Sequence, residues 1–250
     1  MRAFAHRGGG LEAEENTLES FFYAHDLGYR RIETDAHLSH DGQVILNHDP
    51  DLSRVFGVNA QLSALSWRQL ASLRGKNGGR LLRLRDALAL FPDTYFNVDA
   101  KHPAVVDRLF EDVARAHALD RVNFASFQAA SLRRLRQLGA KHTALTMPEI
   151  AALKIRSVLK MGPGNLRHLV AAGIECVQIP TSHTGVDLTS ADFVDTAHEA
   201  GLKIDYWTID DRSEIRRLLE IGADGIITDR PAVLKEVLLD MGCWEGRSAA

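Results

Sequence analysis

The feature that most constrains the fold is a regular alternation of extended and helical stretches along most of the chain. Helical stretches such as 104–118, 190–200 and 231–241 follow most of the extended ones, and a more irregular helical region is expected over 148–172. Eight alternating βα units are typical of a (β/α)8 TIM barrel, which carries its site at the C-terminal ends of its strands. The eight extended stretches cover residues 2–6, 30–36, 94–101, 121–126, 142–147, 175–180, 203–209 and 225–229.

Residues 30–49 depart from this alternation. The connection from Asp35 to the next extended run, at Val44, is too short for a parallel crossover, which needs about a dozen residues. An Asp-Gly pair at 41–42 is a turn signal. We therefore predict a small β-hairpin excursion after the second strand. Folding the hairpin about this turn brings His48 back beside Glu33 and Asp35.

Length and composition agree with one barrel domain over residues 1–250. The chain has 250 residues, of which 45% are hydrophobic and 25% charged, an ordinary globular composition. The net charge of −3 gives no basic field for nucleic acid, so no nucleic-acid partner is expected. The two cysteines are far apart in the sequence, which argues against a disulfide framework.

The sequence shows no sign of a membrane or export segment. No apolar run approaches the roughly 20 residues that span a bilayer, and no charged stretch followed by an apolar one opens the chain. We expect a cytoplasmic protein without stable membrane insertion, and we expect the polar tail at 245–250 to fray. The sequence leaves the oligomeric state open.

Three carboxylates are expected at one end of the sheet. Glu33 and Asp35 point to the same face of the second strand because strand side chains alternate, and Asp99 shares a face of the third barrel strand with Lys101. Like charges at this spacing repel unless a cation lies between them. Ligands that are all oxygen suit Mg²⁺ or Ca²⁺ better than zinc, so the cluster predicts a site for a divalent cation.

Two histidines and two fixed cations accompany the carboxylates. His6 and His48 lie beside the strands that flank the cluster, and histidines can serve as general acid and general base near neutral pH. Arg7 and Lys101 are suited to hold an anionic substrate. Metal, cations and histidines together fit the cleavage of a phosphate ester best, because a metal neutralises charge on the transferring phosphoryl group.

Some of these residues also have plainer interpretations. A salt bridge to Arg7 or Arg31 would account for Glu33 and Asp35. A strand-end histidine is often satisfied by a backbone carbonyl.

The same applies to three further residues. Lys101 would serve simply to neutralise Asp99, and Asn16 is a good N-cap for a helix that begins at 16 or 17. Trp207 fits either the core or the wall of the pocket that receives the substrate's alcohol group.

Many short motifs resemble the glycerophosphodiester phosphodiesterase family, and they cover nearly the whole chain. They are His6-Arg7-Gly8, Glu15-Asn16-Thr17, Glu33-x-Asp35, Asp41-Gly42, His48-Asp49, Asn97-Val98-Asp99-Ala100-Lys101, Ala125-Ser126-Phe127, Trp207-Thr208-Ile209 and Gly225-Ile226-Ile227-Thr228-Asp229-Arg230-Pro231.

The resemblance implies the hydrolysis of small glycerophosphodiesters to glycerol 3-phosphate and an alcohol on a TIM barrel. It implies two catalytic histidines, a divalent metal, Mg²⁺ or Ca²⁺, and further residues that contact the substrate. The catalytic pair would be His6 and His48, the metal ligands Glu33, Asp35 and Asp99, and the substrate contacts Arg7, Lys101, Asn16 and Trp207. The attack on phosphorus, by water directly or first by a glycerol hydroxyl to give a cyclic phosphate, stays open.

Three departures from the family pattern bear on specificity. The family usually has proline where this chain has Glu14, which changes a loop and adds a negative charge beside the site. The third metal carboxylate is commonly glutamate and is here Asp99, one methylene shorter. A large insertion that some members carry between His48 and the Asp99 strand is missing, so a more open pocket is expected.

Two other functions stay open. A lysophospholipase D would use the same chemistry on a lipid and would need an apolar rim beside the pocket for the acyl chain. A catalytically silent barrel that only binds phosphate esters would be expected to have lost a histidine or a carboxylate, yet all five are present.

Overall fold

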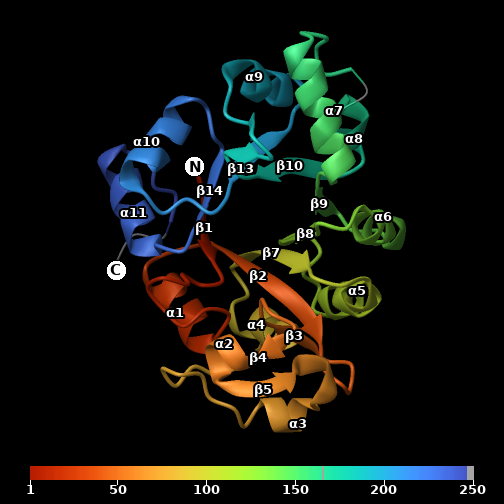
Figure 1. Ribbon diagram of the computed structural model, residues 1–250, viewed down its shortest axis with the longest axis vertical. Coiled ribbons are helices and arrows are strands. Elements are labelled where there is room, and N and C mark those ends of the chain that lie inside the picture. The colour runs from red at the N-terminus through yellow and green to blue at the C-terminus, as the bar shows by residue number, and fades with distance from the viewer. Residues whose placement is uncertain (165, 247–250) are drawn as a thin grey trace.

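The computed structural model describes residues 1–164 and 166–246, and its centre is a closed barrel of eight parallel strands (Figure 1). Strands β1 and β14 pair in parallel, and β1 also pairs with β2, so the first and last strands close the ring. The predicted (β/α)8 TIM barrel is confirmed. Its strands are β1 (Arg2–His6), β2 (Arg31–Leu38), β7 (Tyr95–Ala100), β8 (Val122–Ala125), β9 (His142–Ala144), β10 (Ile174–Ile179), β13 (Lys203–Tyr206) and β14 (Gly225–Thr228).

Helices surround the barrel and bury their apolar faces against its strands. One hydrophobic cluster contains side chains from the strands and from the helices, for example Phe96 of β7, Phe124 of β8 and Leu109 of α5. The helices are α1 (Leu18–Asp26), α4 (Leu84–Leu90), α5 (Val106–Arg115), α6 (Ala129–Leu138), α7 (Met147–Val158), α8 (Leu166–Ala171), α9 (Ala191–Glu199), α10 (Arg212–Glu220) and α11 (Pro231–Asp240), with a 3-10 turn at Pro103–Val105.

The predicted irregular region 148–172 contains two helices. The first, α7, begins at a capping box in which Thr146 accepts from the backbone N–H of Glu149, while the Glu149 carboxylate accepts from that of Thr146. In Figure 1, α7 stands at the edge of the molecule beyond β10. A short antiparallel pair, β11 (Ser182–His183) and β12 (Val186–Asp187), follows β10.

The predicted hairpin is present, and the excursion is larger than expected. Strand β3 (Val44–Leu46) runs antiparallel to β2, with Ala36 opposite Leu46, and β6 (Leu82–Arg83) pairs with β3. The segment between has its own small core, which includes Leu52, Phe56 and Leu70. The other elements are β4 (Asp51–Leu52), α2 (Ser53–Phe56), β5 (Val58–Gln61), a 3-10 turn at Leu62–Ala64 and α3 (Trp67–Leu70).

The N-cap prediction for Asn16 is wrong. Helix α1 begins at Leu18, and its N-cap is Thr17, whose side chain accepts a hydrogen bond from the backbone N–H of Ser20. Asn16 is fully buried and has a φ of 54°, in the left-handed region that asparagine tolerates better than most residues. Its side chain makes tertiary hydrogen bonds instead.

At the C-terminal end, Glu245 forms an ion pair with the amino group of Met1. The rest of the tail that we expect to fray, residues 247–250, lies outside the described residues. Within the part of the chain that the structure describes, none of the helices has the length and apolar character needed to cross a bilayer.

Candidate active site

A cavity of about 530 Å³ opens at the C-terminal ends of the barrel strands, where the sequence predicts the site. The predicted histidines, carboxylates and cations all line it, as does Trp207. We call one group of its polar side chains the polar floor; they lie on β1, β2 and β7, directly after β1 and β7, or in the segment after β3. The polar floor consists of His6, Arg7, Glu33, Asp35, His48, Asn97, Asp99 and Lys101.

Lys101 joins two of the three carboxylates. Its Nζ lies 2.6 Å from Oδ1 of Asp35 and 2.8 Å from Oδ2 of Asp99. Burial would lower the pKa of Lys101, but the two carboxylates outweigh burial and raise it, so Lys101 is a fixed cation. Lys101 therefore neutralises Asp99, as its plainer interpretation predicts, and it also neutralises Asp35.

Asp35 is the most fully bonded carboxylate of the site. Arg7 Nε lies 3.1 Å from its Oδ2, and the Asn16 amide donates to the same oxygen at 2.8 Å. Thr34 in turn donates to Oδ1 of Asn16 at 2.6 Å, which fixes the orientation of that amide. Burial would raise the pKa of Asp35, but Lys101 and Arg7 outweigh it, and the pKa is lowered. Asn16 therefore acts on Asp35 and does not line the cavity.

For Glu33 and Asp99, neighbouring cations and hydrogen bonds compensate less of the cost of burying the charge. Burial, followed by the charge of Asp35, raises the pKa of Glu33 to about 8. Burial also raises the pKa of Asp99. Oε2 of Glu33 and Oδ1 of Asp99 are buried without a hydrogen-bond partner in the described part of the chain. A buried oxygen without a hydrogen bond is costly, and each of these two oxygens can still accept a bond from a cationic ligand.

This donor set fits a divalent cation in its chemistry, because three carboxylates line one pocket and two of them have a buried oxygen that accepts no hydrogen bond from the described residues. As placed, however, no group of three or more His, Cys, Asp or Glu side chains within residues 1–164 and 166–246 is arranged to hold a metal ion. Lys101 supplies the positive charge between Asp35 and Asp99 in this arrangement.

His6 is held from two sides. Its Nδ1 lies 2.8 Å from Oδ1 of Asp229, and its Nε2 lies 3.5 Å from Oε2 of Glu33. Burial would lower the pKa of His6, but Glu33 and the bond to Asp229 outweigh it, so the pKa is raised. Because Asp229 occupies one ring nitrogen, Nε2 is the nitrogen that can exchange a proton with a substrate.

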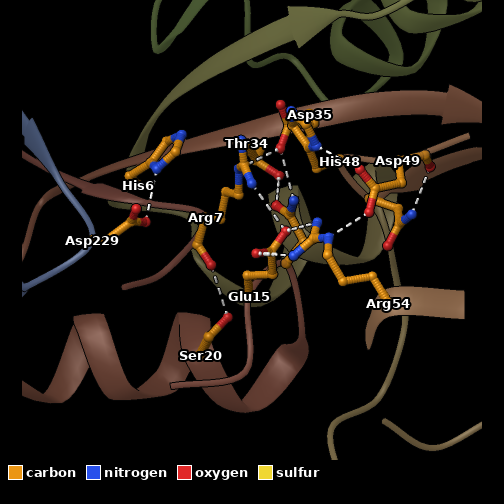
Figure 2. Close-up of polar contacts among 12 residues, drawn as sticks. His6, Arg7, Glu15, Ser20, Thr34, Asp35, His48, Asp49, Arg54 and Asp229 are labelled. Carbon is orange, nitrogen blue, oxygen red and sulfur yellow. Dashed lines mark hydrogen bonds and ion pairs between the residues drawn. The ribbon is translucent and has the colours of Figure 1, made fainter. Parts of the chain in front are cut away.

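His48 sits at the start of a chain of ion pairs (Figure 2). Its Nδ1 lies 2.8 Å from Oδ1 of Asp49, whose Oδ2 lies 2.6 Å from Nε of Arg54. Arg54 also donates to both oxygens of Glu15 at 2.7 Å, and Glu15 accepts from Arg7 at 3.1 Å. His48 is thus connected to the arginine that contacts Asp35.

Apolar side chains form one side of the cavity, and we call this set the apolar wall. Phe127, which follows β8, is 64% exposed, and Ile155 of α7 is 58% exposed. The rings of Phe127 and Trp207 meet edge to face with centroids 5.9 Å apart. These contacts favour a role of Trp207 in the wall of the pocket over a role in the core. The apolar wall consists of Phe127, Met147, Ile150, Ile155, Val186 and Trp207.

Glu14 was expected to add a negative charge beside the site, but it does not line the cavity. Its carboxylate accepts from the backbone N–H groups of Asn77, at 3.0 Å, and Gly79, at 2.8 Å. A Cβ on Gly75 or Gly79 would collide with this carboxylate, so the turn and Glu14 pack closely. The residue ties the 75–79 turn to the loop before α1.

Sequence reasoning missed three residues that support the site: Asp229, Glu15 and Arg54. Asp229 directly follows β14, so a carboxylate at the end of a predicted barrel strand is the signal that could have identified it. Glu15 lies in a recognised motif but was given no role. No local pattern marks Arg54.

Comparisons with known proteins agree with this architecture. The family model described as glycerophosphoryl diester phosphodiesterase matches residues 6–233. A probable glycerophosphodiester phosphodiesterase 2 of Mycobacterium tuberculosis is 31% identical over 98% of this chain and 93% of its own length. Lysophospholipase D GDPD1 of Rattus norvegicus is 24% identical over 96% of this chain and 87% of its own. A crystal structure of a glycerophosphoryl diester phosphodiesterase from Silicibacter pomeroyi, 23% identical, has a TM-score of 0.78 and covers 97% of this chain and 94% of that one, which shows the fold.

The barrel, the site at its C-terminal end and these matches define an enzyme of the phosphoric diester hydrolase class. The 31% identity covers almost the full length of both chains, and the family model covers residues 6–233. The chain belongs to the glycerophosphoryl diester phosphodiesterase family.

Proposed function

We propose that this protein hydrolyses glycerophosphodiesters to glycerol 3-phosphate and an alcohol, with a divalent cation and with His6 and His48 as the acid/base pair. One observation carries the proposal: the predicted histidines, carboxylates and cations all line a single cavity at the C-terminal end of the barrel. This set provides charge compensation for a phosphodiester and two groups that exchange protons near neutral pH.

Arg7 and Lys101 would bind the phosphate. Both are positively charged at neutral pH and face the cavity, and their ion pairs with Asp35 fix their positions before substrate arrives. Positioning that precedes binding lowers the entropic cost of the reaction. Arg7 offers the planar fork that suits phosphate oxygens.

The two histidines would move the protons. One accepts the proton of the hydroxyl that attacks phosphorus, and the other donates a proton to the alkoxide that leaves. Water is consumed, the bond between phosphorus and the alcohol oxygen breaks, and the alcohol departs protonated. Asp229 and Asp49 each occupy Nδ1 of their histidine, so both rings present Nε2 for proton transfer.

Glu33, Asp35 and Asp99 would hold the cation, which is Mg²⁺ or Ca²⁺ because all three ligands are carboxylates. When bound, it would neutralise charge on the phosphoryl oxygens. The two buried oxygens of Glu33 and Asp99 that lack hydrogen-bond partners in the described residues support this assignment. The ion pairs of Lys101 would have to rearrange to complete the ligand set.

The test is the release of glycerol 3-phosphate from glycerophosphocholine. Protein stripped with chelator should be inactive, and either Mg²⁺ or Ca²⁺ should restore turnover. His6→Ala and His48→Ala should each lose about 10²- to 10⁴-fold in kcat. His168→Ala, at an exposed position of α8 outside the cavity, is the matched control and should retain activity. Activity that survives chelation, or that both histidine variants keep, would refute the respective part of the proposal.

A further inference from the structure

The apolar wall is more than a water-soluble substrate needs. Glycerol phosphate with a small polar head group would occupy the polar floor around Lys101 and Arg7. The wall instead places Phe127, Met147, Ile155 and Val186 at the cavity while each side chain stays exposed. Exposed apolar side chains that gather in a pocket indicate a ligand with an apolar part.

The wall continues along one face of α7. Met147, Ala151 and Ile155 all line the cavity and follow one another at intervals of four residues, so they lie on the same side of the helix. Val158 and Leu159, three and four residues further on, extend this face beyond the cavity, and both are exposed. The apolar surface therefore runs from the pocket toward the C-terminal end of α7, and this helix lies at the edge of the molecule (Figure 1).

Charged groups are few along this path. Among the residues of α7, all of which the structure describes, Lys154 is the one charged side chain that lines the cavity. Its Nζ is directed to Ser190 Oγ at 3.4 Å and lies 5.7 Å from the centre of the Phe193 ring. It therefore turns toward α9. Between Met147 and Ile155, the side of α7 that lines the cavity is therefore mainly apolar.

We infer that the apolar wall binds the acyl chain of a lysophospholipid, so that the preferred substrate is a glycerophosphodiester with one acyl chain on its glycerol. This inference rests on the proposed function, since the same bond is cleaved: water adds across the bond between phosphorus and the head-group oxygen. Lysophosphatidylcholine would give free choline and an acylglycerol phosphate. The acyl chain would leave the floor along Met147 and Ile155.

The test compares choline release from glycerophosphocholine with that from lysophosphatidylcholines of increasing chain length, each below its micelle concentration. The value of kcat/KM should rise about fourfold for each methylene that enters the wall and then level off. A value that is independent of chain length would overturn the inference, while hydrolysis of glycerophosphocholine would leave the proposed function intact. Folded protein that releases no choline from either substrate with either cation would overturn both.

Two variants test the location. Ile155→Asp should lower the ratio of kcat/KM for decanoyl lysophosphatidylcholine to that for glycerophosphocholine at least tenfold, because it puts a charge in the path of the chain. Leu239→Asp makes the same change at a position of α11 that is 54% exposed and outside the cavity, and it should leave the ratio unchanged. Equal ratios in the two variants would overturn the wall as the acyl site. Two-chain phosphatidylcholine hydrolysed as well as the lysolipid would overturn the restriction to one chain.

Discussion

Nε of Arg54 lies 2.6 Å from Oδ2 of Asp49, and this ion pair connects the excursion after β2 with the carboxylate that holds His48. The other guanidinium nitrogens of Arg54 bind Glu15, which also binds Arg7. Arg54 does not line the cavity, yet it fixes the two residues that hold His48 and Arg7 in place.

Loss of Arg54 should therefore impair catalysis without touching substrate. We expect Arg54→Ala to lower kcat about 10- to 100-fold with a smaller change in KM, because small displacements of catalytic groups are costly. Arg54→Lys should recover only part of this, since lysine cannot bind both carboxylates with a planar fork. Arg80 is an arginine of similar exposure that pairs with Glu19 outside the site, so Arg80→Ala should leave kcat unchanged. Equal kcat values in the alanine variants at 54 and 80 would contradict the role of Arg54.

The same network predicts a pH dependence of stability. Burial would raise the pKa of Glu15 and of Asp49, but the bonds to Arg54 outweigh it and both pKa values are lowered. A carboxyl group with a lowered pKa in the folded state stabilises the protein above its unfolded pKa of about 4, and this is lost as pH falls through the folded value. Arg54→Ala should thus lower the free energy of unfolding by about 1 kcal/mol at pH 7 and by much less at pH 3, measured by urea denaturation. An equal loss at both pH values would argue against this linkage.

Asp229 offers a second test of positioning. If its carboxylate orients His6, Asp229→Ala should lower kcat about 10²- to 10⁴-fold and shift the acid limb of the pH profile, with KM nearly unchanged. Asp224 directly precedes β14, at the end of the barrel opposite the cavity, and lies 2.9 Å from His198, so Asp224→Ala is a matched control. If Asp229→Ala keeps the kcat and the pH profile of the wild type, an orienting role of Asp229 is excluded.

The sequence predicts most of the fold because the βα alternation and the turn at 41–42 are local signals. It also predicts the polar floor, because the carboxyl ends of barrel strands meet at one end of the barrel. Asp35 and Asp99 lie side by side in β2 and β7, next to the last parallel pair of these two strands. The excursion after β2 is underestimated because its strands are short: β4 and β6 have two residues each, too few to show a period.

Contacts across the closed ring are harder to predict. His6 and Asp229 are 223 positions apart and meet because β1 pairs with β14. Asn16 has the local preference of an N-cap, but the bonds to Asp35 and Thr34 prevail and leave the cap to Thr17. The face of α7 that carries Ile155 resembles any core-facing helix, because an apolar period does not reveal which face is left uncovered.

Lys101 should be structurally important when no cation is bound. Lys101→Met leaves Asp35 and Asp99 buried without their shared partner, so the free energy of unfolding should fall by about 3 kcal/mol in the stripped protein. Mg²⁺ or Ca²⁺ should then raise the melting temperature of this variant more than that of the wild type. Lys141→Met, which breaks an exposed pair with Asp120, should cost less than about 1 kcal/mol and show no extra response to the cation. Identical responses in all three proteins would contradict a cation site beside Lys101.

Asp99 gives the most direct test of the cation site. Its Oδ1 is buried without a hydrogen-bond partner in the described residues, and its side chain is one methylene shorter than the glutamate that is common in the family. Asp99→Asn removes the charge and should raise the cation concentration for half-maximal activity, and the dissociation constant measured by calorimetry, at least tenfold. Asp99→Glu keeps the charge and should stay close to the wild type. Asp107→Asn, at an exposed carboxylate that pairs with Arg134, is the control. An unchanged cation requirement in Asp99→Asn would remove Asp99 from the ligand set.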